Sequence, residues 1–241
     1  MKSPSLTREW DADVRVLAGV EALADGTVKL QQVRDWRYTR TDVIDTRYFD
    51  ATFDPDDITN LWMYEQNLDG SGLIAHTFLV FEFNPSYGPA RYLGISVETR
   101  REVGEKYSVL GGMMRRFEVT HIWATERDLV RRRVEFLDYP LTRFQLNVPP
   151  AIRARIFRKL TLETQQLAST PQWYHTALNN CTSSLIQYVN ESEPGAIPRH
   201  YSNLLTGQAA EYLGRLGYLD TDSEQTIDRA FLASNPLRDA T

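Results

Sequence analysis

The sequence predicts an α+β domain whose strands come first along the chain and whose helices mostly come later. Between residues 74 and 139, segments dense in β-branched and aromatic residues are separated by turn sequences. After Pro149-Pro150, apolar residues instead recur at helical spacing. Because strands and helices do not alternate regularly, an antiparallel sheet with separate helices is favoured over a parallel sheet.

The first half of the chain contains most of the predicted strands. Residues 54–57 predict a helix start, because proline and acidic side chains are typical of a first helical turn. Residues 74–83 and 92–99 predict a hairpin, joined by the turn sequence at 84–89. Further strands are predicted at residues 117–124 and 129–139.

The second half predicts helices. One begins after Pro149-Pro150, with Ile152, Ile156 and Leu160 on one face. The next begins at Cys181, and two more helical segments are predicted at residues 208–216 and 223–232.

Composition excludes several classes of protein. With 42% hydrophobic and 24% charged residues, the 241-residue chain has the balance of a globular protein with a substantial core. A net charge of -5 argues against nucleic acid as a partner, and we interpret the run at residues 131–133 as a solvated basic face. No run of about 18 apolar residues predicts a membrane span. Residues 1–5, at the start of the chain, lack the apolar core of a signal peptide. If the natural protein is exported, we therefore expect this chain to be a processed or truncated form of it.

The number and spacing of the cysteine and histidine residues predict neither a metal site nor a cofactor site. A single cysteine excludes an intrachain disulfide and a multi-thiolate zinc site. The four histidines, at positions 76, 121, 175 and 200, show no spacing typical of a ligand pair. We interpret His121 as packed, and His175 and His200 as turn or loop residues, although His175 is also a rival base near Cys181.

Cys181 is a candidate nucleophile, because a thiol at a helix N-terminus faces the positive end of the backbone dipole, which stabilises the thiolate. The alternative is a small buried hydrophobe on the core face of the same helix.

His76 is the candidate base. If the hairpin turn centres near Tyr87, His76 lies opposite Glu98, whose carboxylate could orient the imidazole. Ser96, two residues away on the same face, is the alternative orienting residue, and Glu98 could instead pair with Arg100 or Arg101.

Several segments together resemble the bacterial family known as the Lnb N-terminal periplasmic domain, over about residues 30 to 218. The matching segments are AHTFLVF at 75–81, SVETRREVGEKYS at 96–108, ERD at 126–128, WYHT at 173–176, NCT at 180–182, LLTG at 204–207 and LGYL at 216–219. The family resembles circularly permuted papain-like enzymes, a group that includes NlpC-type peptidases and lecithin-retinol-type acyltransferases.

The resemblance implies an antiparallel sheet whose histidine strand packs on a cysteine-bearing helix. It implies Cys181 as nucleophile, His76 as base and Glu98 or Ser96 as orienting residue; the Asn180 side chain and the Cys181 amide would stabilise an oxyanion. The implied domains are an N-terminal extension at 1–30, the thiol enzyme at 31–220 and a C-terminal helical tail at 221–241.

The resemblance also implies a function in the periplasm or cell envelope. This is acyl transfer through a thioester from a phospholipid to the N-terminus of a lipoprotein. A lipid donor needs an apolar approach, and the Met-containing segment at 109–114 is either an acyl or membrane contact or an ordinary turn that leads into a core strand. Lipid phosphate could be bound by four cationic side chains, those of Arg100, Arg101, Arg115 and Arg116. Alternatively, these side chains could form ion pairs with nearby glutamates. The alternatives are a thiol amidase or peptidase on cell-wall or other peptides and a non-catalytic binding domain. The oligomeric state is not predicted.

Overall fold

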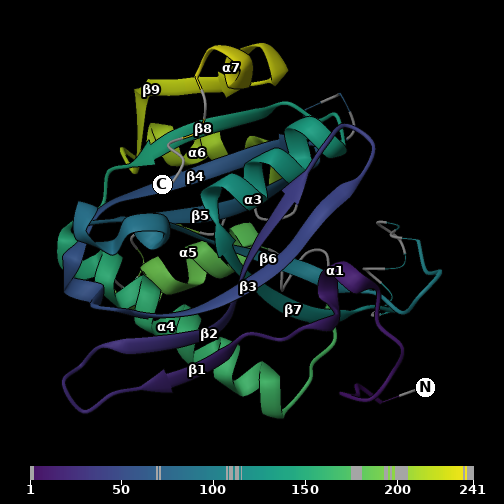
Figure 1. Ribbon diagram of the computed structural model, residues 1–241. Coiled ribbons are helices and arrows are strands. Elements are labelled where there is room, and N and C mark those ends of the chain that lie inside the picture. Colours follow the sequence, from purple (N-terminus) through teal and green to yellow (C-terminus); the bar gives the residue numbers. More distant parts are fainter. Residues whose placement is uncertain are drawn as a thin grey trace.

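A computed structural model describes residues 3–68, 70, 72–106, 108, 111, 114, 116–174, 181–192, 195, 197–198, 206–235 and 237. Within them, one nine-stranded sheet has the order β1-β2-β7-β6-β5-β4-β8-β9, with β3 paired to β2 (Figure 1). The strands are β1 (Gly19–Ala22), β2 (Val28–Tyr38), β3 (Val43–Phe53), β4 (Ile58–Asn67), β5 (Ala75–Phe83), β6 (Tyr92–Arg100), β7 (Glu118–Thr125), β8 (Leu141–Leu146) and β9 (Leu219–Ile227).

Helices cover both faces of this sheet. They are α1 (Ala12–Arg15), α3 (Glu126–Arg131), α4 (Pro150–Ser169), α5 (Cys181–Ser192), α6 (Ala209–Arg215) and α7 (Arg229–Ser234). A π-helical turn (Arg132–Phe136) continues α3, and short 3-10 turns occupy Pro55–Asp57, Pro85–Arg91 and Thr206–Gln208. All neighbouring strands pair antiparallel except β2 and β7, which pair parallel at Arg34 and Ala124. The α+β class with a mostly antiparallel sheet is therefore confirmed.

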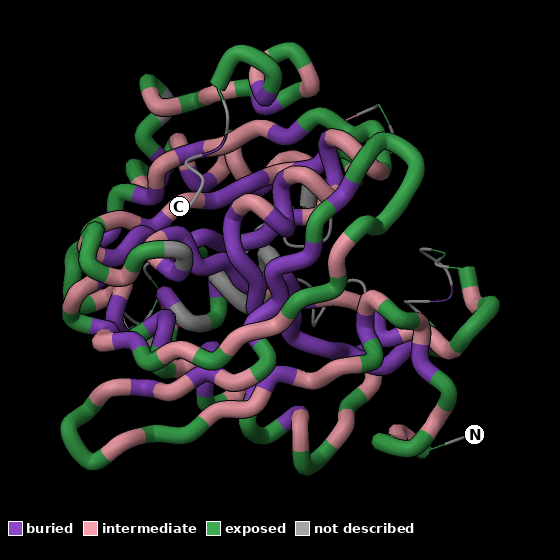
Figure 2. The backbone as a smooth tube through the Cα atoms, viewed as in Figure 1, coloured by how far each residue is buried: buried purple, intermediate pink, exposed green. Residues whose placement is uncertain are grey.

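The two faces of the sheet have separate cores. Leu79 of β5 packs with Phe157 of α4 and Ile186 of α5 in the larger core. On the other face, Phe78 packs with Leu129 of α3 in a smaller core. Figure 2 shows the buried backbone concentrated in the central strands between these layers. Even-numbered residues of β5 therefore face α3, and odd-numbered residues face α4 and α5.

Most predicted elements are present. The hairpin of β5 and β6, the strand β7 and the helices α4, α5 and α6 lie where the sequence places them, each within a few residues.

The helix predicted from residue 54 is wrong. Only the three residues Pro55–Asp57 form a 3-10 turn, with the Asp54 side chain accepting a hydrogen bond from the Asp56 amide. The chain then enters β4, which pairs with β5 and β8 on its two sides. Backbone pairing to two neighbours outweighs a short apolar pattern that fits a helix equally well.

The strand predicted at 129–139 is also wrong, because α3 and its π-helical turn occupy most of it. Thr125 caps this helix by accepting a hydrogen bond from the Asp128 amide. The helix predicted at 223–232 is wrong in its first half, since β9 extends to Ile227. The helix α7 begins only after Asp228, whose side chain accepts a hydrogen bond from the Phe231 amide.

His121 is packed as expected and has a partner. It lies on β7, with Nδ1 2.9 Å from Oγ1 of Thr164 on α4. That hydroxyl donates its one proton to the Leu160 carbonyl at 2.7 Å, so His121 donates to Thr164 from Nδ1. Burial lowers the pKa of His121 to about 4.

We expect this histidine to make the fold sensitive to mild acid. The unfolded chain binds a proton at His121 near pH 6.5, whereas the folded protein does not until about pH 4. Stability is therefore lost as pH falls from 6.5 to 4, by roughly 3 kcal/mol. Urea denaturation at pH 7, 5.5 and 4 should show a smaller loss in His121→Asn than in the wild type. An equal loss in the two proteins would show that His121 does not titrate in this way.

Candidate active site

The hairpin of β5 and β6 brings the predicted base and its orienting residues together. Its ladder runs from the pair Glu82–Tyr92 to the pair Leu79–Ile95, and the same register continued by three residues would set His76 opposite Glu98. The His76 Nε2 and Glu98 Oε1 atoms are 3.4 Å apart. The turn at Pro85–Arg91 centres near residue 87, as the sequence predicts.

Ser96 lies between the imidazole and the carboxylate. Its Oγ is 2.8 Å from His76 Nε2 and donates a hydrogen bond to Glu98 Oε1 at 2.7 Å. The alternative, in which Glu98 pairs with Arg100 or Arg101, is wrong, because Glu98 pairs with Arg133.

The hydrogen bonds of Ser96 favour one tautomer of the His76 ring. A serine hydroxyl has one proton, and Ser96 gives it to Glu98, so Ser96 can only accept from the imidazole. A His76 ring with its proton on Nε2 would donate that proton to Ser96. In the neutral ring the basic lone pair is then on Nδ1.

Arg133 is the fourth member of this cluster and was not predicted. Its Nη2 donates to Glu98 Oε1 at 2.8 Å and to Ser96 Oγ at 3.0 Å. Its Nη2 also lies 3.1 Å from His76 Nε2. The nature of that third contact depends on the His76 tautomer: with the ring proton on Nε2 it joins two donors, and with the proton on Nδ1 it is a hydrogen bond from Arg133.

The interpretation of residues 131–133 as a solvated face is wrong. The side chain of Arg133 is only 2% exposed. Arg131 pairs with Glu135, and Arg132 pairs with Asp13. A helical assignment of this segment would have placed Arg133 one turn after the buried Leu129, which is the signal that the sequence contained.

The charges of the cluster are balanced. Burial would raise the pKa of the Glu98 carboxyl, but His76 and then Arg133 offset this and hold it well below its usual range. Burial lowers the pKa of Arg133 to about 10, opposed by the Glu98 carboxylate. At neutral pH the cluster therefore contains an ionised pair beside His76, whose side chain is 17% exposed.

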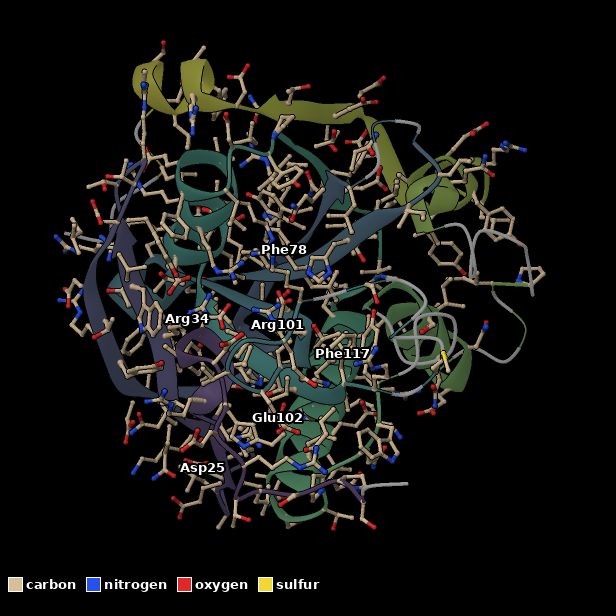
Figure 3. All side chains as sticks on the ribbon, turned by 90° about the vertical axis from the view of Figure 1, so that its right-hand side faces the viewer. Asp25, Arg34, Phe78, Arg101, Glu102 and Phe117 are labelled. Atoms are coloured by element: carbon tan, nitrogen blue, oxygen red, sulfur yellow. The ribbon has the colours of Figure 1, made fainter. Side chains whose placement is uncertain are left out.

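The candidate nucleophile begins a helix that packs on the same two strands. Cys181 is the first residue of α5, and α5 contacts β5 and β6. The side chain of Cys181, together with Asn180 and His175, lies outside the described residues. The His76 side chain lies on the sheet face that α3 covers, with Phe78, which is labelled in Figure 3. The helix α5 packs on the opposite face.

Two arginines considered for lipid phosphate are engaged inside the protein. Arg100 donates to the carbonyls of Val14 and Arg15. Arg101, labelled in Figure 3, pairs with Asp11 and Asp13. Both therefore fasten the N-terminal segment to β6. Arg115 and most of the segment at 109–114 lie outside the described residues.

No group of three or more His, Cys, Asp or Glu side chains in the described part of the chain is placed to hold a metal ion. No helix among the same residues is long and apolar enough to cross a membrane.

The fold and the cluster define an α+β domain with a polar histidine-serine-glutamate chain on its central hairpin. The chain belongs to the family described as the Lnb N-terminal periplasmic domain, whose model matches residues 45–207. The resemblance seen in the sequence is thereby confirmed, although the match is shorter than the range of 30 to 218 expected. No curated protein and no solved structure matches the chain.

Proposed function

We propose that the protein is a thiol acyltransferase of the cell envelope with Cys181 as nucleophile and His76 as base. One observation supports this most strongly: Ser96 joins the His76 imidazole to the Glu98 carboxylate, an arrangement that with the ring proton on Nε2 leaves Nδ1 as the basic nitrogen. A base held by an orienting group is what an activated thiol requires. The family's name, which describes a periplasmic domain, supports an envelope location.

In the proposed reaction, Nδ1 of His76 accepts the thiol proton of Cys181. The thiolate then attacks the ester carbonyl of a phospholipid, which forms the carbon–sulfur bond and a tetrahedral oxyanion. Collapse of this oxyanion breaks the ester carbon–oxygen bond and leaves the acyl group on sulfur as a thioester. The imidazolium returns its proton to the leaving alcohol, which departs as a lysophospholipid. The oxyanion would be stabilised by the Cys181 amide and the Asn180 side chain.

The thioester would then be resolved by the amine of a lipoprotein N-terminus. His76 accepts the amine proton, the amide bond forms, and the thiolate leaves. Water in place of the amine would make the protein a hydrolase, and a peptide in place of the lipid would make it an amidase or peptidase.

The proposed reaction requires the thiol of Cys181 to reach the imidazole of His76. Because α5 and the His76 side chain are on opposite faces of the sheet, the thiol must meet the imidazole around the end of a strand. His76 is the second residue of β5, so such an approach is short. A permuted papain-like arrangement of the two groups is part of the proposal.

The same observation favours a second candidate, a non-catalytic envelope binding domain. In that case His76, Ser96, Glu98 and Arg133 form a structural network that joins β5 and β6 to the π-helical turn.

Mass spectrometry of the intact protein after incubation with phospholipid vesicles tests the proposal. We expect a mass increase equal to one acyl chain, which hydroxylamine removes and which is absent in Cys181→Ala. An adduct with peptide donors alone would favour the amidase. No adduct, together with a Cys181 that alkylates no faster than a free thiol, would overturn the thiol enzyme and favour the binding domain.

A further inference from the structure

Arg133 is a buried cation at the point where three polar side chains of the hairpin meet. It lies in the π-helical turn Arg132–Phe136. This conformation is rare in proteins as a whole, and where it does occur it is often at a functional site. Its guanidinium carbon lies 4.5 Å from the centre of the Phe78 ring, and its Nη1 donates to the Leu129 carbonyl at 3.0 Å. The guanidinium group is therefore held between an aromatic ring and a backbone carbonyl.

The guanidinium group directs one nitrogen at the cluster. Nη2 donates to both oxygens, to Glu98 Oε1 at 2.8 Å and to Ser96 Oγ at 3.0 Å. Ser96 gives its own proton to Glu98 and, with the ring proton of His76 on Nε2, accepts from His76. Removal of Arg133 would free a lone pair on each oxygen, and the order of donors and acceptors would be less constrained.

The charge of Arg133 acts on the same imidazole. A cation 3.1 Å from His76 Nε2 opposes protonation of the ring, whereas the Glu98 carboxylate at 3.4 Å favours it. Arg132 adds a second cation near Glu98, and Gln66, which pairs with His76 from β4, is neutral. Among the described residues, Arg133 is therefore the cation in closest contact with the imidazole.

We propose that Arg133 is a positioning residue that fixes the His76–Ser96–Glu98 proton chain and keeps the imidazole neutral, an inference that rests on the function proposed above. Without it, Glu98 would bind an imidazolium as its ion-pair partner, and Nδ1 would be occupied by a proton. The base would then be unable to accept the proton of a thiol at neutral pH.

Lysine cannot fully replace this arginine. An ammonium group could still neutralise Glu98, but it has no planar fork to stack on Phe78 while donating in two fixed directions. Arg133→Lys therefore retains the positive charge but loses the fixed orientation of the donor, whereas Arg133→Met loses both.

The test follows the His76 imidazole by NMR in protein labelled at histidine Cε1, without any substrate. The chain has four histidines, and His76→Asn identifies the signal by its loss. In Arg133→Met we expect the titration midpoint of His76 to rise by about one to three pH units, from the loss of one charge at this distance. In Arg133→Lys the midpoint should stay within about half a unit of the wild type, while the acyl adduct forms more slowly.

Arg131→Met is the matched control. Arg131 is two residues earlier in the same helical segment, but its side chain is 24% exposed and pairs with Glu135. The His76 midpoint should not move in this variant. A midpoint unchanged in a folded Arg133→Met protein would overturn the proposal.

If Arg133→Met does not fold, the same titration is measured in Glu98→Gln. This variant retains the cation and removes the anion, so the midpoint should fall; an unchanged midpoint would count against the proposal. Because the titration needs no thiol chemistry, it separates the two hypotheses. A shifted midpoint with an unreactive Cys181 would contradict the thiol enzyme, while the electrostatic role of Arg133 would stand.

Discussion

Replacing His76 with alanine is expected to slow thioester formation at Cys181 by about 10²–10⁴-fold at pH 7, the usual contribution of a positioned base. The loss should depend on pH. A free thiol ionises near pH 8.5, so at pH 9.5 Cys181 no longer needs a base to form its thiolate. Quenched mass spectrometry at pH 7 and 9.5 should therefore show the ratio of wild-type to variant rates fall sharply as pH rises.

His121→Asn serves as the control for this measurement. His121 is buried between β7 and α4 and bonded to Thr164, away from the polar cluster. At pH 7 its replacement should leave the rate of thioester formation close to that of the wild type. A His76→Ala protein that reacts as fast as the wild type would remove the imidazole from the mechanism.

Replacing Asp128 with asparagine should reduce the free energy of unfolding by about 3–5 kcal/mol, since it leaves a buried charge without its partner. Asp128 is fully buried at the start of α3. Arg34 donates to both of its oxygens, from Nε at 2.9 Å and from Nη2 at 2.8 Å. The Trp36 amide and the Tyr38 hydroxyl also donate to this carboxylate. An amide cannot accept all four bonds or balance the Arg34 charge.

Urea denaturation at pH 7 measures this effect, with Asp56→Asn as control. Asp56 pairs with Arg158 at an exposed position, where an ion pair contributes at most about 1 kcal/mol. A loss in Asp128→Asn no larger than that of the control would show that the Arg34–Asp128 pair does not hold α3 on β2.

The register of the central hairpin could be predicted because local signals determine it. A compact turn flanked by two segments of β-formers has its centre near Tyr87, and symmetry about that centre gives the observed pair Leu79–Ile95 and, continued, brings His76 toward Glu98. The catalytic roles of these residues stay predictions.

Arg133 could not be found in the same way, because its place depends on a distant contact. The segment after Thr125 contains valine, leucine and phenylalanine and fits a strand as well as a helix. What holds it as a helix is the capping of its first turn by Thr125 and the hydrogen bond that Asp128 accepts from Arg34, which is 94 residues away in the sequence. Tertiary contacts of this kind outweigh local propensity.

The pairing of β3 determines how this chain can be cut for study. The family match begins at residue 45, inside β3, yet among the described strands β3 pairs with β2 alone. β2 in turn pairs with β7. A fragment limited to 45–207 would leave β3 without its neighbour and open the backbone of β7 to other chains, a common route to aggregation. A fragment intended to remain monomeric in solution should retain the first hairpin and, at the other end of the sheet, β9 on β8.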